Sequence, residues 1–458
     1  MLATRLRRRH DARVSQVAVA NRREQRGWYF YDWANSTFST TVVSVFLGPY
    51  LTDITKAAAG PDGFVHMLGI PVRATAWFTA MVFVSVALQV LVLPLVGALA
   101  DRTRSKRWML AGWAYLGALA TSCLVFVRDE RFLLGGLLFV VANLALGASI
   151  VVYNSFLPDI AEPNERDAVS SRGWALGYLG GAVLLTANLV LYGARHSLGL
   201  SDGAAVRICL LSAGVWWAVF TLVPLFTLRD RPPRRVVPAG GSGPVVAGFR
   251  QLGTTLRELR GFRQSLLFLV AFLLYNDGIQ AAISFSATYG NQELKLEQGT
   301  LASAILLVQF VAFGGGLALG RVARRVGAKH TILGTLVVWT AVVAVAAVLP
   351  AGQALPFYLL AVVIGFVLGG SQALSRSLFS QLIPAGREAE YFGIYEISDS
   401  ATSGIGALLI FVTLQVTGSY RLAIAALVVF FVAGFFLLSR VDVVRGVREV
   451  GNDVPEVV

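Results

Sequence analysis

The sequence predicts an all-α integral membrane protein with twelve transmembrane helices arranged in two pseudo-symmetric six-helix halves. Composition is the first observation, since the 458 residues are 56% hydrophobic and only 14% charged, whereas soluble domains carry roughly 25% charged residues. Length is the second, because twelve apolar stretches approach or exceed the ~20 helical residues that cross a bilayer. The third is an internal repeat in which the basic connections of the first half recur in the second.

The apolar stretches divide the chain evenly. They fall at residues 27–50, 74–100, 108–127, 132–156, 173–192 and 205–228, and then at 265–290, 300–320, 331–349, 355–379, 391–416 and 420–439. We therefore expect a basic tail at 1–26, a six-helix half at 27–228, a linker at 229–263, a second half at 264–440 and a tail at 441–458. Residues 52–73 and 158–172 are expected to be polar connections. The linker is rich in proline and glycine, and its second part has apolar residues at helical spacing, which predicts an amphipathic helix on the membrane surface.

The basic residues predict the orientation of the chain. With both termini cytoplasmic, 31 of the 39 lysines and arginines lie on the cytoplasmic side, and the outer side keeps only Lys56, Arg73, Arg128, Arg131, Arg195, Arg207, Lys295 and Arg421. This asymmetry is typical of membrane proteins. It also accounts for the net charge of +13 without a nucleic-acid partner.

Cysteine and histidine are too sparse for a metal centre. Cys123 and Cys209 each lie within an apolar stretch, and the four histidines lie in tails or connections. We expect no metal ion and no cofactor. We also expect no enzyme activity, because the apolar stretches contain no nucleophile and base together, and no nucleotide-binding motif that would energise a pump is present.

Two short sequence motifs of the first half, which we call anchors, recur at corresponding positions in the second half and show the repeat. The stretch from Gly97 to Arg107 follows the second span, and a similar glycine and arginine stretch from Gly316 follows the eighth, an offset of 219 residues. Pro163 and Pro384 mark the second pair, with an offset of 221 residues. Six spans per repeat give both halves the same orientation, so they are expected to pair about an axis along the membrane normal.

The first anchor resembles the signature between spans 2 and 3 of the major facilitator superfamily, a glycine followed by an aspartate–arginine pair and further basic residues. This resemblance implies the major facilitator fold and a latch that stabilises one conformation. Its expected members are Gly97, Asp101, Arg102, Arg107 and Arg321. Apart from the resemblance, Glu396 and Asp399 could act as a structural latch at the cytoplasmic end by pairing with Arg376 or Arg387. In the second half Gly320 stands where an aspartate is expected.

A second resemblance covers essentially the whole chain. The runs Tyr31–Ser36, Gly173–Gly181 and Tyr275–Gln280 resemble the vacuolar amino-acid effluxer family, the autophagy-related branch of that superfamily. The resemblance implies the export of amino acids. The glycines of the middle run are expected to mark close helix packing.

Polar stripes within apolar spans point to the transport site. Asp32, Asn35, Ser36 and Ser39 share one face of span 1, and a carboxylate inside a membrane helix is a functional candidate. The expected residues that bind substrate or protons are Asp32, Asn35, Ser36, Asn143, Asp277, Gln280, Ser284 and Gln372. We expect Asp32 and Asp277 to face one central cavity, with at least one of them sensing the solute or protons.

The prediction is a secondary transporter of small solutes in the plasma (inner) membrane of a bacterium, acting as a monomer by rocking its two halves. Amino-acid export is the leading function. Two alternatives stay open, an exporter of another small solute and a channel or sensor on the same fold. Proton coupling, the direction of transport and the solute are left open by the sequence.

Overall fold

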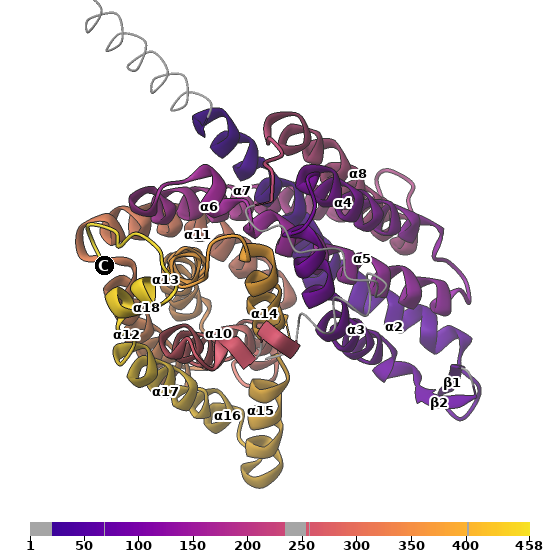
Figure 1. Cartoon of the computed structure of the whole chain (residues 1–458). Helices are drawn as coiled ribbons and strands as arrows, with labels where there is room; N and C mark the ends of the chain where they lie inside the picture. The colour runs from indigo at the N-terminus through magenta and orange to yellow at the C-terminus, as the bar shows by residue number, and fades with distance from the viewer. Residues whose placement is uncertain (1–20, 68, 234–252, 256, 401–402) are drawn as a thin grey trace, which may run out of the picture.

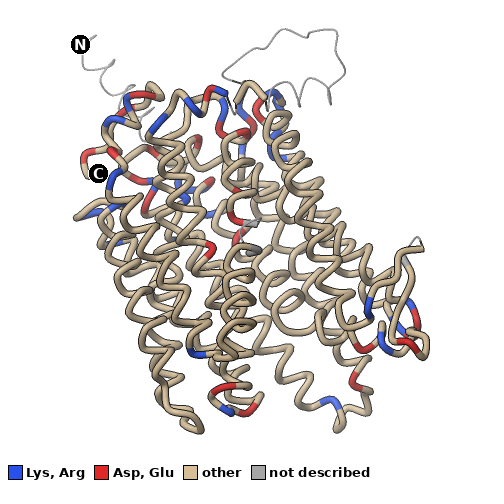
Figure 2. Tube along the Cα trace, turned by 90° about the horizontal axis from the view of Figure 1, so that it is seen from below, with Lys and Arg blue, Asp and Glu red and all other residues tan. Residues whose placement is uncertain are grey.

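The computed structural model describes residues 21–67, 69–233, 253–255, 257–400 and 403–458. Within these residues the chain is helical apart from one β-hairpin, and ten helices are long and apolar enough to cross a membrane. The other two predicted spans are each built from more than one helical piece. Lysine, arginine, aspartate and glutamate gather at the two ends of the helices, and the middle is nearly free of them (Figure 2).

The N-terminal half begins with a helix over residues 21–37 that continues as a π-helix, η1 (Phe38–Phe46). The following elements are α2 (Leu47–Ala58), β1 (Phe64–Met67), β2 (Ile70–Arg73), η2 (Ala74–Ala76), α3 (Trp77–Ala100), α4 (Lys106–Cys123), η3 (Leu124–Phe126), α5 (Phe132–Asn154), α6 (Leu157–Ile160), η4 (Pro163–Glu165), α7 (Arg166–Gly193) and α8 (Asp202–Thr227). In η1, Ser44 donates its hydroxyl hydrogen to the carbonyl oxygen of Ser39 five residues earlier, a spacing that matches the wider π turn.

The C-terminal half follows short helical pieces at residues 253–255 and 257–259. Its elements are α10 (Arg263–Gln292), α11 (Gln298–Val326), α12 (Ala328–Ala346), α13 (Ala354–Gln381), α14 (Glu388–Ser400), α15 (Ser403–Thr417), α16 (Tyr420–Ala426), α17 (Val428–Ser439) and α18 (Val443–Glu449). The greater part of the predicted linker, including most of its predicted amphipathic helix, lies outside the described residues.

The duplication is visible in where the helices begin. The starts of α4, α5 and α7 are each followed 222 residues later by the starts of α12, α13 and α14 (328 − 106, 354 − 132 and 388 − 166). Each half has its own apolar core. The halves meet where α7 packs on α11 and α13, and where α14 packs on α3 and α5 (Figure 1). The predicted fold of two pseudo-symmetric halves is confirmed.

The two ends of the bundle differ. We call the end that holds α18 and the α3–α4, α11–α12 and α13–α14 connections the α18 end, and the opposite end, which holds β1 and β2, the hairpin end. The loop expected at residues 52–73 is wrong in part, because α2 continues to Ala58 and an antiparallel hairpin pairs Phe64 with Arg73. Gly69 closes this hairpin with a φ of 84°, a conformation that glycine adopts without strain.

The polar connection expected at residues 158–172 is also wrong in its second half, since α7 begins at Arg166. Hydropathy misses this helical start because its polar side chains are buried against the other half of the protein. Arg166, for example, donates from Nη1 to the carbonyl oxygen of Ser380 at 2.8 Å.

Candidate functional site

A buried ion pair joins the two halves. Arg376 of α13 donates from Nη2 to Oδ2 of Asp32, in the first helix, at 3.1 Å. Arg376 is 2% exposed and Asp32 is 9% exposed. The hydroxyl group of Tyr153 donates to the same carboxylate oxygen at 2.7 Å. Taking two charges out of water costs several kcal/mol per ion unless both are well paired, so these contacts hold Asp32 and Arg376 together.

The rest of the Arg376 guanidinium group is also satisfied by the N-terminal half. Its Nε donates to Ser170 Oγ at 2.9 Å and its Nη2 to the Ser170 carbonyl oxygen at 3.0 Å. Its Nη1 donates to Asn154 Oδ1 at 3.3 Å. The guanidinium carbon also lies 4.6 Å from the ring centroid of Trp28 and 5.4 Å from that of Trp174, within the range of a cation–π interaction.

Two glycines of α7 give this group its space. A Cβ atom on Gly173 would lie 2.7 Å from Asp32 Oδ2 and 3.0 Å from Arg376 Nη2. A Cβ atom on Gly177 would lie 2.7 Å from Ser36 Oγ. The glycines that the sequence assigns to close packing therefore lie directly on the predicted polar stripe of span 1.

The other members of that stripe are less engaged with the opposite half. Ser36 donates its hydroxyl hydrogen to the Asp32 carbonyl oxygen at 2.6 Å, a bond within its own helix. Asn35 is buried and Ser39 is exposed. Of the four residues, only Asp32 has a hydrogen bond to the described part of the C-terminal half.

A second polar group lies inside the C-terminal half and is centred on Asn276. The Asn276 side chain donates from Nδ2 to Asp399 Oδ1 at 2.6 Å and accepts from Gln372 Nε2 at 3.1 Å. Gln372 and Asp399 were both candidates from the sequence, and the structure brings them together through Asn276. Sequence reasoning overlooked Asn276 because it stands next to the more conspicuous Asp277.

The side chain of Asp277 packs against α15, and the expectation that it shares a central cavity with Asp32 stays a prediction. Asp277 is 0% exposed, and its Oδ2 lies against Gly406 of α15, where an added Cβ would be 3.3 Å away. Adjacent residues on a helix point about 100° apart, so the face that turns Asn276 toward α13 turns Asp277 toward α15. Gln280 is half-buried and Ser284 is exposed.

Asn143 is engaged by a neighbouring helix of its own half. Its Nδ2 donates to Ser85 Oγ at 2.9 Å, and its carbonyl oxygen accepts from Gln89 Nε2 at 2.8 Å. Both partners belong to α3. Asn143 is half-buried, and these contacts fix the spacing of α3 and α5.

The predicted latch residue Asp101 contacts the opposite half at the α18 end. Its two carboxylate oxygens accept from the backbone N–H groups of Ala389 and Glu390 at 3.0 and 2.9 Å. Asp101 thus caps α14, where a negative charge is favoured. Burial raises the pKa of Asp101 to about 7, although Lys106 at 3.7 Å acts in the opposite direction.

Gly97 lets the two halves touch at the same place. A Cβ atom on Gly97 would lie 2.3 Å from the carbonyl oxygen of Ala389. In the second half, a Cβ atom on Gly320 would lie 2.5 Å from Ser171 of α7. The residue that replaces the expected aspartate is therefore a point of close approach between the halves.

The remaining latch candidates have other partners. Arg107 pairs at 3.0 Å with Asp230, at the start of the linker that follows the N-terminal half. Arg321 is exposed and donates to the Leu317 carbonyl oxygen of its own helix. Arg387 pairs with Glu258 and Glu390 rather than with Glu396 or Asp399. Glu396 is buried, and Arg102 is half-buried.

A set of contacts that the sequence did not indicate completes the α18 end. Gln381 of α13 accepts from Arg166 Nη1 at 3.2 Å and donates from Nε2 to the Pro163 carbonyl oxygen at 2.8 Å. Ser377 donates to Asp167 Oδ1 at 2.5 Å. The start of α7 is thereby tied to the end of α13, so both inter-half surfaces are closed at this end.

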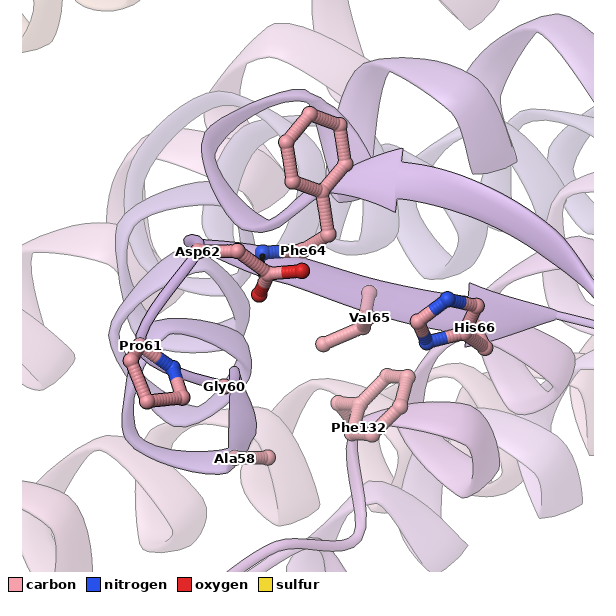
Figure 3. Close-up of a pocket in the computed structure, with 8 residues that line it drawn as sticks. All are labelled: Ala58, Gly60, Pro61, Asp62, Phe64, Val65, His66 and Phe132. Atoms are coloured by element: carbon pink, nitrogen blue, oxygen red, sulfur yellow. Dashed lines mark hydrogen bonds between the residues drawn. The ribbon is translucent and has the colours of Figure 1, made fainter.

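A separate pocket lies at the hairpin end. It has a cavity volume of about 490 Å³ and is bordered by β1, by the segment that leads to it and by Phe132 (Figure 3). His66 and Asp62 are its ionisable side chains. None of the candidate site residues lines this pocket.

Solved structures with the same architecture are transporters. The human organic anion transporter MFSD10 has a TM-score of 0.68 at 14% identity, with 91% of this chain and 99% of that chain covered. The transporter FucP in its outward conformation has a TM-score of 0.65 at 12% identity, covering 91% and 97%. These likenesses place the fold in the major facilitator class.

The sequence comparisons identify the family within this class. Residues 20–451 match the family described as vacuole effluxer Atg22 like, and the chain belongs to this family. An uncharacterized MFS-type transporter of Bacillus subtilis, YxiO, is 28% identical over 437 residues, covering 94% of this chain and 98% of that protein. Autophagy-related protein 22 of Yarrowia lipolytica is 29% identical over 477 residues, covering 85% and 79%.

Proposed function

We propose that this transporter exports small solutes that carry an amino group, with amino acids as the leading class, by alternating access between its two ends. The main support for alternating access is the ion pair between Asp32 and Arg376, which joins the two halves at 3.1 Å. This pair can persist only while the α18 end is closed. A separation of the halves at that end must break the pair and hydrate both charges. The protein is thus built for two states rather than one.

The α18 end is the cytoplasmic end in this proposal, because it holds the connections that carry most of the basic residues. The structure then represents the outward-facing state, and the solute is loaded after the α18 end opens. Structural neighbours support this assignment, since FucP and a bacterial ferroportin homologue are described in outward states. The bacterial relative YxiO supports a plasma-membrane location, and the protein is proposed to act as a monomer.

The polar groups suggest how solute and protons are handled. Asp32 and Arg376 offer one charge of each sign, which suits a zwitterion. The Asn276 group, with Asp399 and Gln372, offers a second polar contact in the other half. Proton coupling through one of these carboxylates is part of the proposal.

Flux from proteoliposomes tests this function. Purified protein is reconstituted, loaded with single radiolabelled amino acids and assayed with and without a pH gradient. The proposal expects saturable release of at least one amino acid, which Asp32→Asn reduces and the exposed-site variant Gly112→Ala does not. Fluxes that match protein-free liposomes for every amino acid would reject amino-acid export, and unsaturable flux would favour the channel alternative.

A further inference from the structure

We propose that the N-terminal half contains a complete binding site for an organic cation, that Arg376 fills this site in the present state, and that the positive group of the solute occupies it when the α18 end opens. The last part rests on the proposed export function. The first two parts concern binding and can be tested without transport.

The site is complete in its hydrogen bonds and ring contacts, because in the described part of the chain all of those made by the guanidinium group are to the N-terminal half; the buried Glu396 of α14 adds an electrostatic interaction from the C-terminal half. The acceptors are Oδ2 of Asp32, Oδ1 of Asn154, and both the hydroxyl and the carbonyl oxygens of Ser170. The aromatic faces are those of Trp28, Tyr153 and Trp174, with ring centroids 4.6, 5.5 and 5.4 Å from the guanidinium carbon. Among the groups joined by these contacts, Arg376 alone comes from the C-terminal half.

These groups also hold one another without Arg376. Trp28 donates from Nε1 to the Tyr153 carbonyl oxygen at 2.9 Å, and the two rings stack at 4.3 Å. The Tyr153 hydroxyl orients the Asp32 carboxylate. When α13 moves away with the C-terminal half, the site should keep its shape. A preformed site binds a ligand with less loss of conformational entropy.

The chemistry of the lining selects a cation. One carboxylate, neutral acceptor oxygens and the faces of aromatic rings all favour positive charge. The donors of a guanidinium or ammonium group match these acceptors, whereas an anion would meet the Asp32 carboxylate. Arg376 is then a tethered competitor, and its return to the site on closure would displace the cationic group of the solute toward the hairpin end.

The first test empties the site by Arg376→Ala and offers guanidinium chloride. The thermal unfolding midpoint of the detergent-solubilised variant is measured against guanidinium concentrations far below those that denature proteins. We expect a saturable rise in the midpoint, a much smaller rise for the wild type, and no rise with potassium chloride. Urea is the neutral analogue of the same shape and should be without effect. The double variant Arg376→Ala, Asp32→Asn should lose the response.

A second test leaves Arg376 intact, in case its removal prevents folding. Gly97→Ala forces α3 and α14 apart at the α18 end, and Gly112→Ala, where an added Cβ has no neighbour within 4 Å, is the matched control. We expect methylammonium and guanidinium to stabilise Gly97→Ala more than Gly112→Ala, with urea inert. Equal responses of the two glycine variants, together with no response of Arg376→Ala, would overturn the cation site.

A competition experiment tests whether the solute uses the cation site, independently of whether the site exists. Guanidinium applied from the α18 side should inhibit the flux of any transported amino acid, and it should do so competitively. Binding to Arg376→Ala without inhibition of flux would retain the site and overturn its use by the solute. An absence of flux in every assay would reject the export function while the binding result still decides the site.

Discussion

Gly97→Ala should favour opening of the α18 end through a contact that involves neither Asp32 nor Arg376. The added Cβ would lie 2.3 Å from the carbonyl oxygen of Ala389, and ordinary contact begins at 3.4 Å. The neighbouring backbone must therefore retreat by about 1.1 Å (3.4 − 2.3). A retreat of that size would stretch the two bonds from α14 to Asp101, now 3.0 and 2.9 Å, beyond hydrogen-bond range.

Forcing an extra methyl group into a close contact costs about 1–3 kcal/mol. Because this cost falls on the closed state only, the open-to-closed ratio should rise about 5- to 150-fold. Ser380 is a suitable reporter, since its side chain is buried at this end of α13. In a background with Cys123 and Cys209 replaced, Ser380→Cys should react with a maleimide faster in proportion to the open fraction.

Gly112→Ala is the control, because it adds the same methyl group to an exposed face of α4. Equal labelling rates in the Gly97→Ala and Gly112→Ala proteins would refute the reasoning. A higher rate with unchanged thermal stability would support a shift between two folded states rather than local unfolding.

Three further predictions concern other contacts. Arg376→Ala should lower the stability of the closed state by about 3–5 kcal/mol, because it leaves Asp32 buried without its partner; adding Asp32→Asn should recover part of this loss in thermal unfolding. Lower pH should favour the closed α18 end, because the pKa of Asp101 is raised to about 7 in the closed contact and would be near 4 once hydrated. Labelling of Ser380→Cys, normalised to an exposed cysteine, should slow from about pH 8 to about pH 6, and Asp101→Asn should flatten this dependence. Asn276→Leu should raise the solute concentration for half-maximal flux, since a lost hydrogen bond to a carboxylate costs about 1.5–3 kcal/mol; an unchanged value would remove the Asn276 group from the solute path.

Hydropathy located the spans well where both faces of a helix are apolar. The stretch predicted at 205–228, for example, is α8 (Asp202–Thr227). It failed where polar side chains are satisfied inside the protein, as at the start of α7. It also failed at the hairpin, because residues 64–73 are too short and too mixed to give a periodic signal.

The candidate site was predictable only in part. Asp32 could be found because an isolated carboxylate in an apolar stretch is conspicuous. Its partner Arg376 could not be found in this way, because it is 344 residues away in the sequence. Four carboxylates within the predicted spans were candidates for pairing with this arginine. Asn276 was missed for a geometric reason, because the choice between it and Asp277 depends on the rotation of α10, which packing against α13 and α15 determines.

Asn154 and Arg376 occupy equivalent places in the two repeats, 222 residues apart, and their side chains are in contact at 3.3 Å. Both residues therefore lie close to the pseudo-twofold axis that relates the repeats. If the protein were a dimer of two identical six-span units, the residue at this position would contact the same residue of the other unit. Two asparagines can meet in this way, because each amide both donates and accepts a hydrogen bond. Two arginines would repel, so arginine at this place requires that the repeats already differ. The ion pair that joins the halves at the α18 end is thus a property that only two diverged repeats can possess.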